Sequence, residues 1–94
     1  MSDDPVVKPG SIAIDERLRA ALDPLSLEVV DDSHLHAGHA GAREGGHYTV
    51  KIVSARFTGL QRVARHRLVY HSLAELMQQG IHALAIDARA PGEP

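Results

Sequence analysis

Apolar residues recur with helical spacing soon after the start of the chain. They are Ile14, Leu18, Ala21 and Leu22. Their i, i+4, i+7 and i+8 spacing places them on one face of a helix. Asp23-Pro24 follows directly, and a proline together with the residue before it interrupts a helix. The pattern therefore predicts a helix that begins at Ser11 and stops before Asp23.

Two later stretches alternate between apolar and polar residues, as strands do. Leu27–Asp31 is the shorter one, and His47–Val53 is the clearest strand of the chain. In the second stretch Tyr48, Val50 and Ile52 would point to one face of a sheet. We expect the two strands to form a hairpin. Their connection is unusually long, and a long connection is more often functional than accidental.

The second half of the chain predicts one long helix and one short strand. Helical spacing runs from Leu60 to Gln79, with the main helix beginning near Arg62 and Gly80 as its C-cap. The final apolar run, from Ala83 to Asp87, suits the middle of a sheet or tight packing against a helix. The predicted buried stripe of the helix consists of Val63, Leu68 or Val69, Leu73, and Leu76 or Met77.

The element order is thus helix, strand, strand, helix, strand, which predicts a single α+β domain. Residues 1–10 end in Pro9-Gly10 and are expected to form a flexible leader, residues 11–90 the domain, and residues 91–94 a tail. The amino terminus is acidic and lacks an apolar export core, and no stretch is long enough to span a bilayer. We therefore expect a cytoplasmic protein that does not enter membranes.

Composition narrows the range of functions. The chain has 94 residues, a formal net charge of −2 and only three aromatic residues, Tyr48, Phe57 and Tyr70. Neither this charge nor this aromatic content favours nucleic acid, so any basic surface must be local. Cysteine is absent, which excludes disulfides, catalytic thiols and cysteine-based metal sites.

The chain has seven histidines, and their distribution is the feature that most suggests a metal-binding function. His34, His36 and His39 lie in the glycine-broken connection between the predicted strands, and His82 opens the last apolar run. Imidazole is the commonest metal ligand among neutral side chains, so these residues form half of a plausible site for a metal or cluster. The alternative is three solvated loop histidines and one hydrogen-bonded His82. We interpret His47, at a strand start, as structural.

Several segments of this chain resemble the BolA family, from about Ile14 to about Pro91. One runs from Asp32 to His39, and another is Tyr48-Thr49-Val50-Lys51-Ile52-Val53-Ser54, followed by Phe57. The most specific are Gly59 to Tyr70, with the run Arg65-His66-Arg67, and Ile81-His82-Ala83-Leu84.

The resemblance implies a fold similar to class II KH domains, with three strands backed by helices. It also implies a heterodimer with a monothiol glutaredoxin that shares a 2Fe–2S cluster, to which the glutaredoxin and its glutathione supply sulfur. The family's two ligands would correspond to His82 and a loop residue, for which His36 matches best, with His39 and His34 in reserve. Cysteine-type members carry their loop ligand where this chain has Arg43 and Glu44. The isolated chain would then be a monomer without a cofactor.

A basic group on the long predicted helix, Arg62, Arg65, His66 and Arg67, allows three interpretations. It is a solvated cationic face, a DNA-binding helix as suggested for BolA relatives, or a docking site for the glutaredoxin or its glutathione carboxylates. The turn from Gly59 to Arg62 lacks the second glycine of the GXXG loop that clamps nucleic acid in KH domains.

No nucleophile–base pair or carboxylate dyad stands out, because Ser33 beside His34 lies in a loop that rarely holds such geometry. We therefore read the chain as a non-enzyme. The favoured hypothesis is an iron–sulfur adaptor for iron sensing or cluster transfer. The alternatives are a DNA-binding transcriptional regulator and a scaffold whose loop histidines hold zinc.

Overall fold

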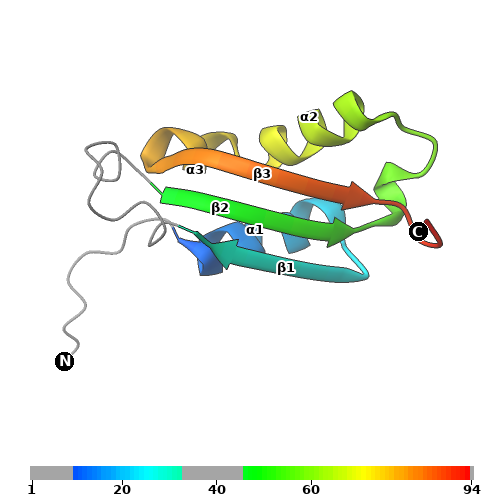
Figure 1. Ribbon diagram of the computed structural model, residues 1–94, viewed down its shortest axis with the longest axis horizontal. Coiled ribbons are helices and arrows are strands. Elements are labelled where there is room, and N and C mark those ends of the chain that lie inside the picture. The colour runs from blue at the N-terminus through cyan, green and yellow to red at the C-terminus, as the bar shows by residue number, and fades with distance from the viewer. Residues whose placement is uncertain (1–9, 33–45, 94) are drawn as a thin grey trace.

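A computed structural model describes residues 10–32 and 46–93 of the chain. Within these residues the domain has three strands and three α-helices, arranged as Figure 1 shows. The elements are α1 (Ser11–Leu22), β1 (Ser26–Asp31), β2 (Gly46–Val53), the 3-10 turn η3 (Ala55–Phe57), α2 (Arg62–Ser72), α3 (Ala74–Gln79) and β3 (Ile81–Arg89). Among the described residues, none of the helices has the length and apolar character needed to cross a membrane.

The sheet has the order β1-β2-β3. β1 pairs antiparallel with β2, with Val29 opposite Val50, which confirms the predicted hairpin. β3 pairs parallel with β2 after the chain has crossed over through α2 and α3. Of the two arrangements expected for the last apolar run, the middle of a sheet is not observed, because β2 takes the central place and β3 is an edge strand. Packing against the helices is observed, since Leu84, Ile86 and Ala88 of β3 lie against the core.

The helices cover one face of the sheet (Figure 1). Tyr48, Val50 and Ile52 of β2 are buried on that face, whereas Lys51 on the opposite face is exposed, as the alternation predicted. The core is a single cluster between the sheet and the helices. Its largest fully buried side chains are Phe57, Ile14, Leu18, Ile52, Leu73, Val50 and Val69.

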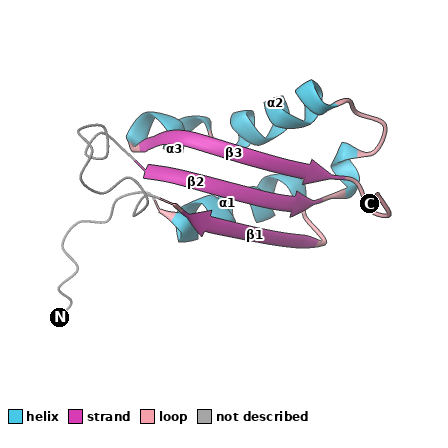
Figure 2. Cartoon of the chain, in the orientation of Figure 1, coloured by secondary structure: helices cyan, strands magenta, loops and turns pink. Residues whose placement is uncertain are grey.

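The predicted single helix from Leu60 to Gln79 is wrong, because the structure has two helices separated at Leu73 (Figure 2). Leu73 has φ −109° and ψ 12°, outside the helical range. At the end of α2 the Ser72 hydroxyl donates to the Leu68 carbonyl oxygen at 2.8 Å. Such a local side-chain contact competes with helical hydrogen bonding and bends helices. The bend lets α3 continue along the sheet with Leu76 buried.

The predicted buried stripe of α2 and α3 is confirmed except at its first residue, Val63. Val69 and Leu73 are fully buried, but Val63 is 63% exposed. At 3.6 residues per turn, Val63 lies roughly 120° around α2 from Val69, so both cannot face the sheet. The face of α2 that turns toward the end of β3 therefore carries arginine at position 65 rather than valine at position 63.

Ser54 fixes the end of the sheet at which α1 and η3 meet. It is fully buried, and its hydroxyl donates to the Leu22 carbonyl oxygen at 2.6 Å and accepts from the Arg56 N–H at 3.1 Å. Its own N–H donates to the Arg89 carbonyl oxygen at 3.0 Å. Ser54 thus joins the end of β2 to the end of α1 through its side chain and to the end of β3 through its main-chain N–H.

Candidate functional site

His82 lies at an irregularity of the sheet. Gly46 of β2 pairs with Ile81, and the next residue, His47, pairs with Ala83. His82 is therefore the extra residue of a β-bulge in an edge strand. Bulges occur next to functional sites because they redirect a side chain that a regular strand would point elsewhere. The resemblance singled out this residue, and the sheet register gives it a special main-chain position.

Both ends of the histidine-containing connection are fixed at this same end of the sheet. The Asp32 N–H donates to the His47 carbonyl oxygen at 2.7 Å. The Gly46 N–H donates to the Gly80 carbonyl oxygen, also at 2.7 Å. The chain thus leaves and re-enters the described structure beside the bulge at His82. His34, His36 and His39 themselves lie outside the described residues, as do Ser33, Arg43 and Glu44.

Side chains around the two fixed ends are well packed. The Thr49 hydroxyl donates to the Asp32 carboxylate at 2.5 Å and holds the start of the connection. Burial, followed by the nearby charge of Asp31, raises the pKa of the Tyr48 phenol. A side chain at position 46 would overlap the Tyr48 ring, so glycine is needed there. Within residues 10–32 and 46–93, no group of three or more histidine and carboxylate side chains is arranged to hold a metal ion.

The opposite end of β3 forms a second candidate site, a groove between α2 and the end of the strand. It has a volume of about 610 Å³. The charged and titratable residues that line it are Arg62, Arg65, His66, Asp87, Arg89 and Glu93. Three of the four basic residues predicted for a binding role therefore share one groove. The fourth, Arg67, is exposed on α2 and does not line it.

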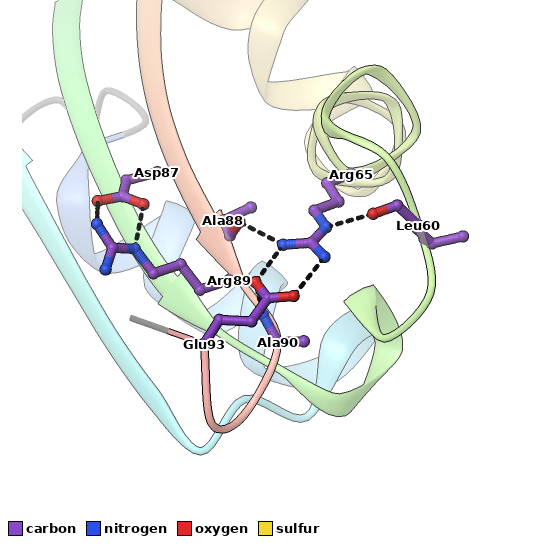
Figure 3. A network of polar contacts seen from close by, with 7 residues as sticks. All are labelled: Leu60, Arg65, Asp87, Ala88, Arg89, Ala90 and Glu93. Carbon is purple, nitrogen blue, oxygen red and sulfur yellow. Dashed lines mark hydrogen bonds and ion pairs between the residues drawn. The ribbon is translucent and has the colours of Figure 1, made fainter.

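Arg65 is the best-connected side chain in the groove (Figure 3). Its guanidinium donates to the Glu93 carboxylate at 2.7 and 2.8 Å, to the Leu60 carbonyl oxygen at 2.8 Å and to the Ala88 carbonyl oxygen at 3.1 Å. The Arg65 side chain is only 13% exposed. The Arg65 guanidinium, with help from the Ala90 N–H, lowers the pKa of Glu93 to about 2. In this bidentate arrangement, with two parallel N–H···O hydrogen bonds, arginine recognises carboxylates with the greatest geometric specificity.

A second ion pair lies beside it on β3. The Arg89 guanidinium contacts the Asp87 carboxylate at 2.9 and 3.2 Å (Figure 3). Hydrogen bonding to Arg89 lowers the pKa of Asp87, and the charges of Lys51 and Arg62 lower it further. Asp87 and Arg89 are two residues apart on one strand and so share a face. Their spacing in the sequence is thus a signal from which this pair could have been predicted.

Glu93 is the residue of this groove that the sequence pattern did not indicate at all. It lies in the segment assigned to the tail, yet it is 28 residues from Arg65, its partner in the ion pair. Nothing in the local sequence pattern predicts a contact over that separation. The basic helix therefore has an acidic counterpart built into the same chain.

The two candidate sites are separated along β3. His82 lies near its start and Arg89 at its end. Seven residues of strand span roughly 23 Å at 3.3 Å per residue. A ligand the size of a tripeptide extends at most about 11 Å and cannot contact both.

Comparisons with known proteins identify the family. Residues 18–93 match the family model described as BolA-like protein. The chloroplastic protein BOLA1 of Arabidopsis thaliana is 46% identical over 82 residues, covering 83% of this chain. This chain spans about half of that relative, 51% of its length. The Escherichia coli protein named DNA-binding transcriptional regulator BolA is 48% identical over 73 residues, covering 78% of this chain and 68% of the relative.

Solved structures agree with these sequence matches. The BolA domain of SufE1 from Arabidopsis thaliana superposes with a TM-score of 0.81 at 43% identity, covering 95% of this chain and 100% of that domain. BolA1 from the same plant gives a TM-score of 0.80 at 41% identity, covering 95% and 99% of the two chains. The predicted α+β fold with a three-stranded sheet is confirmed. The relatives include a human protein named BolA-like protein 1 and the Escherichia coli protein named as a transcriptional regulator. The chain belongs to the BolA family.

Proposed function

We propose that this protein is an iron–sulfur adaptor without catalytic activity of its own. It pairs with a monothiol glutaredoxin and supplies two imidazoles to a shared 2Fe–2S cluster, whose remaining ligands come from the glutaredoxin and its glutathione. His82 is one ligand, and a histidine of the β1–β2 connection, best matched by His36, is the other.

The observation that carries this proposal is the convergence of three main-chain features at one end of the sheet. The bulge at His82, the start of the connection at Asp32 and its return at Gly46 are adjacent. Two histidine-bearing segments that are far apart in sequence therefore begin from the same place. A ligand pair drawn from these segments would come from one end of the sheet.

The donor set suits the proposed cargo. Neutral imidazole is a ligand for iron, and histidines replace cysteines in one known class of 2Fe–2S centre. Such a cluster carries less negative charge than one held by four thiolates, which raises its reduction potential. Because imidazole can be protonated, its binding to the cluster weakens as the pH falls. These properties favour transfer or sensing over permanent storage.

The distance along β3 between His82 and the groove also bears on what the basic residues of α2 can bind. Glutathione bound at the His82 end is too short to reach Arg65, whose guanidinium already holds Glu93. These arginines are therefore not assigned to the glutathione carboxylates. The glutaredoxin itself is large enough to contact either end.

The test is a titration of cluster-loaded monothiol glutaredoxin with this protein, followed by visible absorption and circular dichroism. We expect a spectral change that saturates near one equivalent and is lost with His82→Ala. His71→Ala removes an exposed histidine from α2 and serves as the matched control. An unchanged spectrum with the unsubstituted protein, or an equal change with His82→Ala, would contradict the proposal.

A second candidate function is DNA binding by α2. The name of the Escherichia coli relative supports it, as do Arg62 and His66 on an open groove. The engagement of Arg65 with Glu93 counts against it, because a phosphate would have to replace a carboxylate that is already bound. Anisotropy of a labelled duplex at several salt concentrations tests it. Sequence-dependent binding that is lost with Arg62→Gln and Arg67→Gln, and unaffected by glutaredoxin, would favour this function.

A further inference from the structure

The groove between α2 and the end of β3 has no role in the proposed cluster site. We propose that it is a docking site for an extended acidic segment of a protein partner, which it binds through a carboxylate, and that Glu93 occupies it in the free protein. A partner carboxylate would take the place of Glu93 on Arg65. This inference does not depend on the iron–sulfur proposal.

The carboxylate of Glu93, which occupies the groove in the free protein, shows which chemical group the groove binds. Arg65 presents its two outer nitrogens to both oxygens of the Glu93 carboxylate, and its orientation is fixed by the carbonyl oxygens of Leu60 and Ala88. A guanidinium held in this way is preorganised for a planar carboxylate, so little further ordering is required when another carboxylate binds. A second acidic side chain on the incoming segment would find Arg62 and His66 along the same groove.

The charge balance favours a peptide over a nucleic acid. The groove carries three arginines against Asp87 and Glu93, and Arg89 is paired with Asp87. When Glu93 leaves, the excess positive charge of the groove is that of Arg65 and Arg62. Two charges match one or two carboxylates. They are few for a nucleic acid, because affinity for its backbone grows with the number of phosphates that lysine and arginine neutralise.

β3 is an edge strand of the described sheet, and its outer edge favours an extended backbone in the occupant. The Arg89 carbonyl oxygen faces β2, where it accepts from Ser54. The carbonyl oxygens of Leu84 and Ala88 instead accept from Tyr70 and Arg65 of α2, so they face the outer edge. By alternation along the strand, the N–H and carbonyl oxygen of Ile86 also face that edge, and Ile86 lines the groove. An extended segment could pair with these two groups while its carboxylate binds Arg65.

Exchange of Glu93 requires little disruption. Its side chain is 39% exposed. Beyond the bonds to Arg65, two contacts close the turn that carries it: Ala90 N–H to the Glu93 carboxylate at 3.0 Å and Glu93 N–H to the Ala90 carbonyl oxygen at 3.2 Å. Ala90 at the base of this turn is buried in the core, whereas the following residues, Pro91, Gly92 and Glu93, are exposed. Because the Ala90 N–H loses its carboxylate acceptor when Glu93 leaves, it reports directly on the exchange.

The test uses a fluorescein-labelled, amide-capped hexapeptide of alternating valine and glutamate, and the same peptide with glutamine for glutamate. Fluorescence anisotropy with the full chain should show weak binding of the acidic peptide only. Glu93→Gln should increase the affinity for the acidic peptide about tenfold if Glu93 occupies the groove in about nine-tenths of the free molecules. Glu16→Gln removes the same charge from an exposed position on α1 and should change nothing. Adding Arg62→Gln to Glu93→Gln should weaken binding, whereas adding Arg67→Gln should not.

A second measurement needs no substitution. Addition of the acidic peptide to the ¹⁵N-labelled protein should shift the amide signal of Ala90, and addition of the glutamine peptide should not. The proposal is overturned if Glu93→Gln gains no more affinity than Glu16→Gln, if both peptides bind equally, or if Ala90 does not respond to saturating acidic peptide. It is also overturned if Glu93→Gln increases the affinity for a labelled DNA duplex more than the affinity for the acidic peptide, since the groove would then prefer phosphate to carboxylate.

Discussion

The guanidinium of Arg65 and the carboxylate of Glu93 form two hydrogen bonds, at 2.7 and 2.8 Å, between residues 28 positions apart. This pair joins the first half of α2 to the turn that follows β3. Exposed ion pairs contribute little to stability, but here the arginine is largely buried and also holds the Leu60 and Ala88 carbonyl oxygens. Arg65 is therefore held in the groove by these two carbonyl oxygens as well as by Glu93.

The stability of this protein should depend on pH through Glu93. Its pKa is lowered from 4.5 to about 2 by Arg65 and the Ala90 N–H. A lowered carboxylate pKa stabilises the folded state above the unfolded pKa, and this contribution is lost as the pH falls from about 4.5 to about 2. Thermal unfolding from pH 6 to pH 2 should show a steeper loss for the unsubstituted chain than for Glu93→Gln. Parallel curves would show that the pair is not formed in solution.

Removal of the Ser54 hydroxyl should destabilise the fold by about 1–3 kcal/mol, because Ser54→Ala leaves the Leu22 carbonyl oxygen without its buried donor. Ser26→Ala, at an exposed position in β1, should stay within about 0.5 kcal/mol. Urea unfolding at neutral pH measures both. Equal midpoints for the two variants would mean that the Ser54 hydroxyl does not hold the end of α1 against the end of β2.

Two apolar residues predicted for one stripe should behave differently. Leu73→Ala removes a fully buried side chain at the junction of α2 and α3 and should cost about 2–5 kcal/mol. Val63→Ala, at a position that is 63% exposed, should cost no more than about 0.5 kcal/mol. Denaturant unfolding distinguishes them. A large loss for Val63→Ala would show that α2 does not turn its Val63 side to solvent.

Loop histidines should be partly interchangeable in the proposed complex with glutaredoxin. His36→Ala should reduce the change in the cluster's circular dichroism only in part, because His39 and His34 lie close in sequence. Replacing all three should abolish that ligand's contribution, as His82→Ala abolishes the other. A triple variant with an unaltered spectrum would place the second ligand elsewhere.

Local pattern was sufficient for most of the fold. The helix before Asp23, the hairpin and the inward face of β2 all depend on spacing within a few residues, and the structure confirms each of them. Helix periodicity failed at Leu73, where a serine side chain bonds to the preceding turn. Such a contact is compatible with a continuous helix in most settings, so spacing alone did not reveal the break.

The sites were predictable only in part, because each depends on contacts between distant segments. The family resemblance identified His82, but the bulge that distinguishes it arises from the pairing of β2 with β3. Likewise, charge pattern identified Arg62, Arg65 and His66, while the engagement of Arg65 by Glu93 follows from the return of the chain beside α2. Long-range pairing of this kind leaves no periodic signal in the sequence.

The length of β3 has a consequence for any partner that contacts both of its ends. Once one contact forms, the second becomes intramolecular, and its effective concentration depends on how well the spacing of the partner's two binding elements matches the strand. Two individually weak contacts could then give strong combined binding to a partner whose elements lie roughly 23 Å apart, the span of seven strand residues. A partner with a shorter reach would gain nothing from the second contact. β3 would thereby select partners by their dimensions as well as by their chemistry.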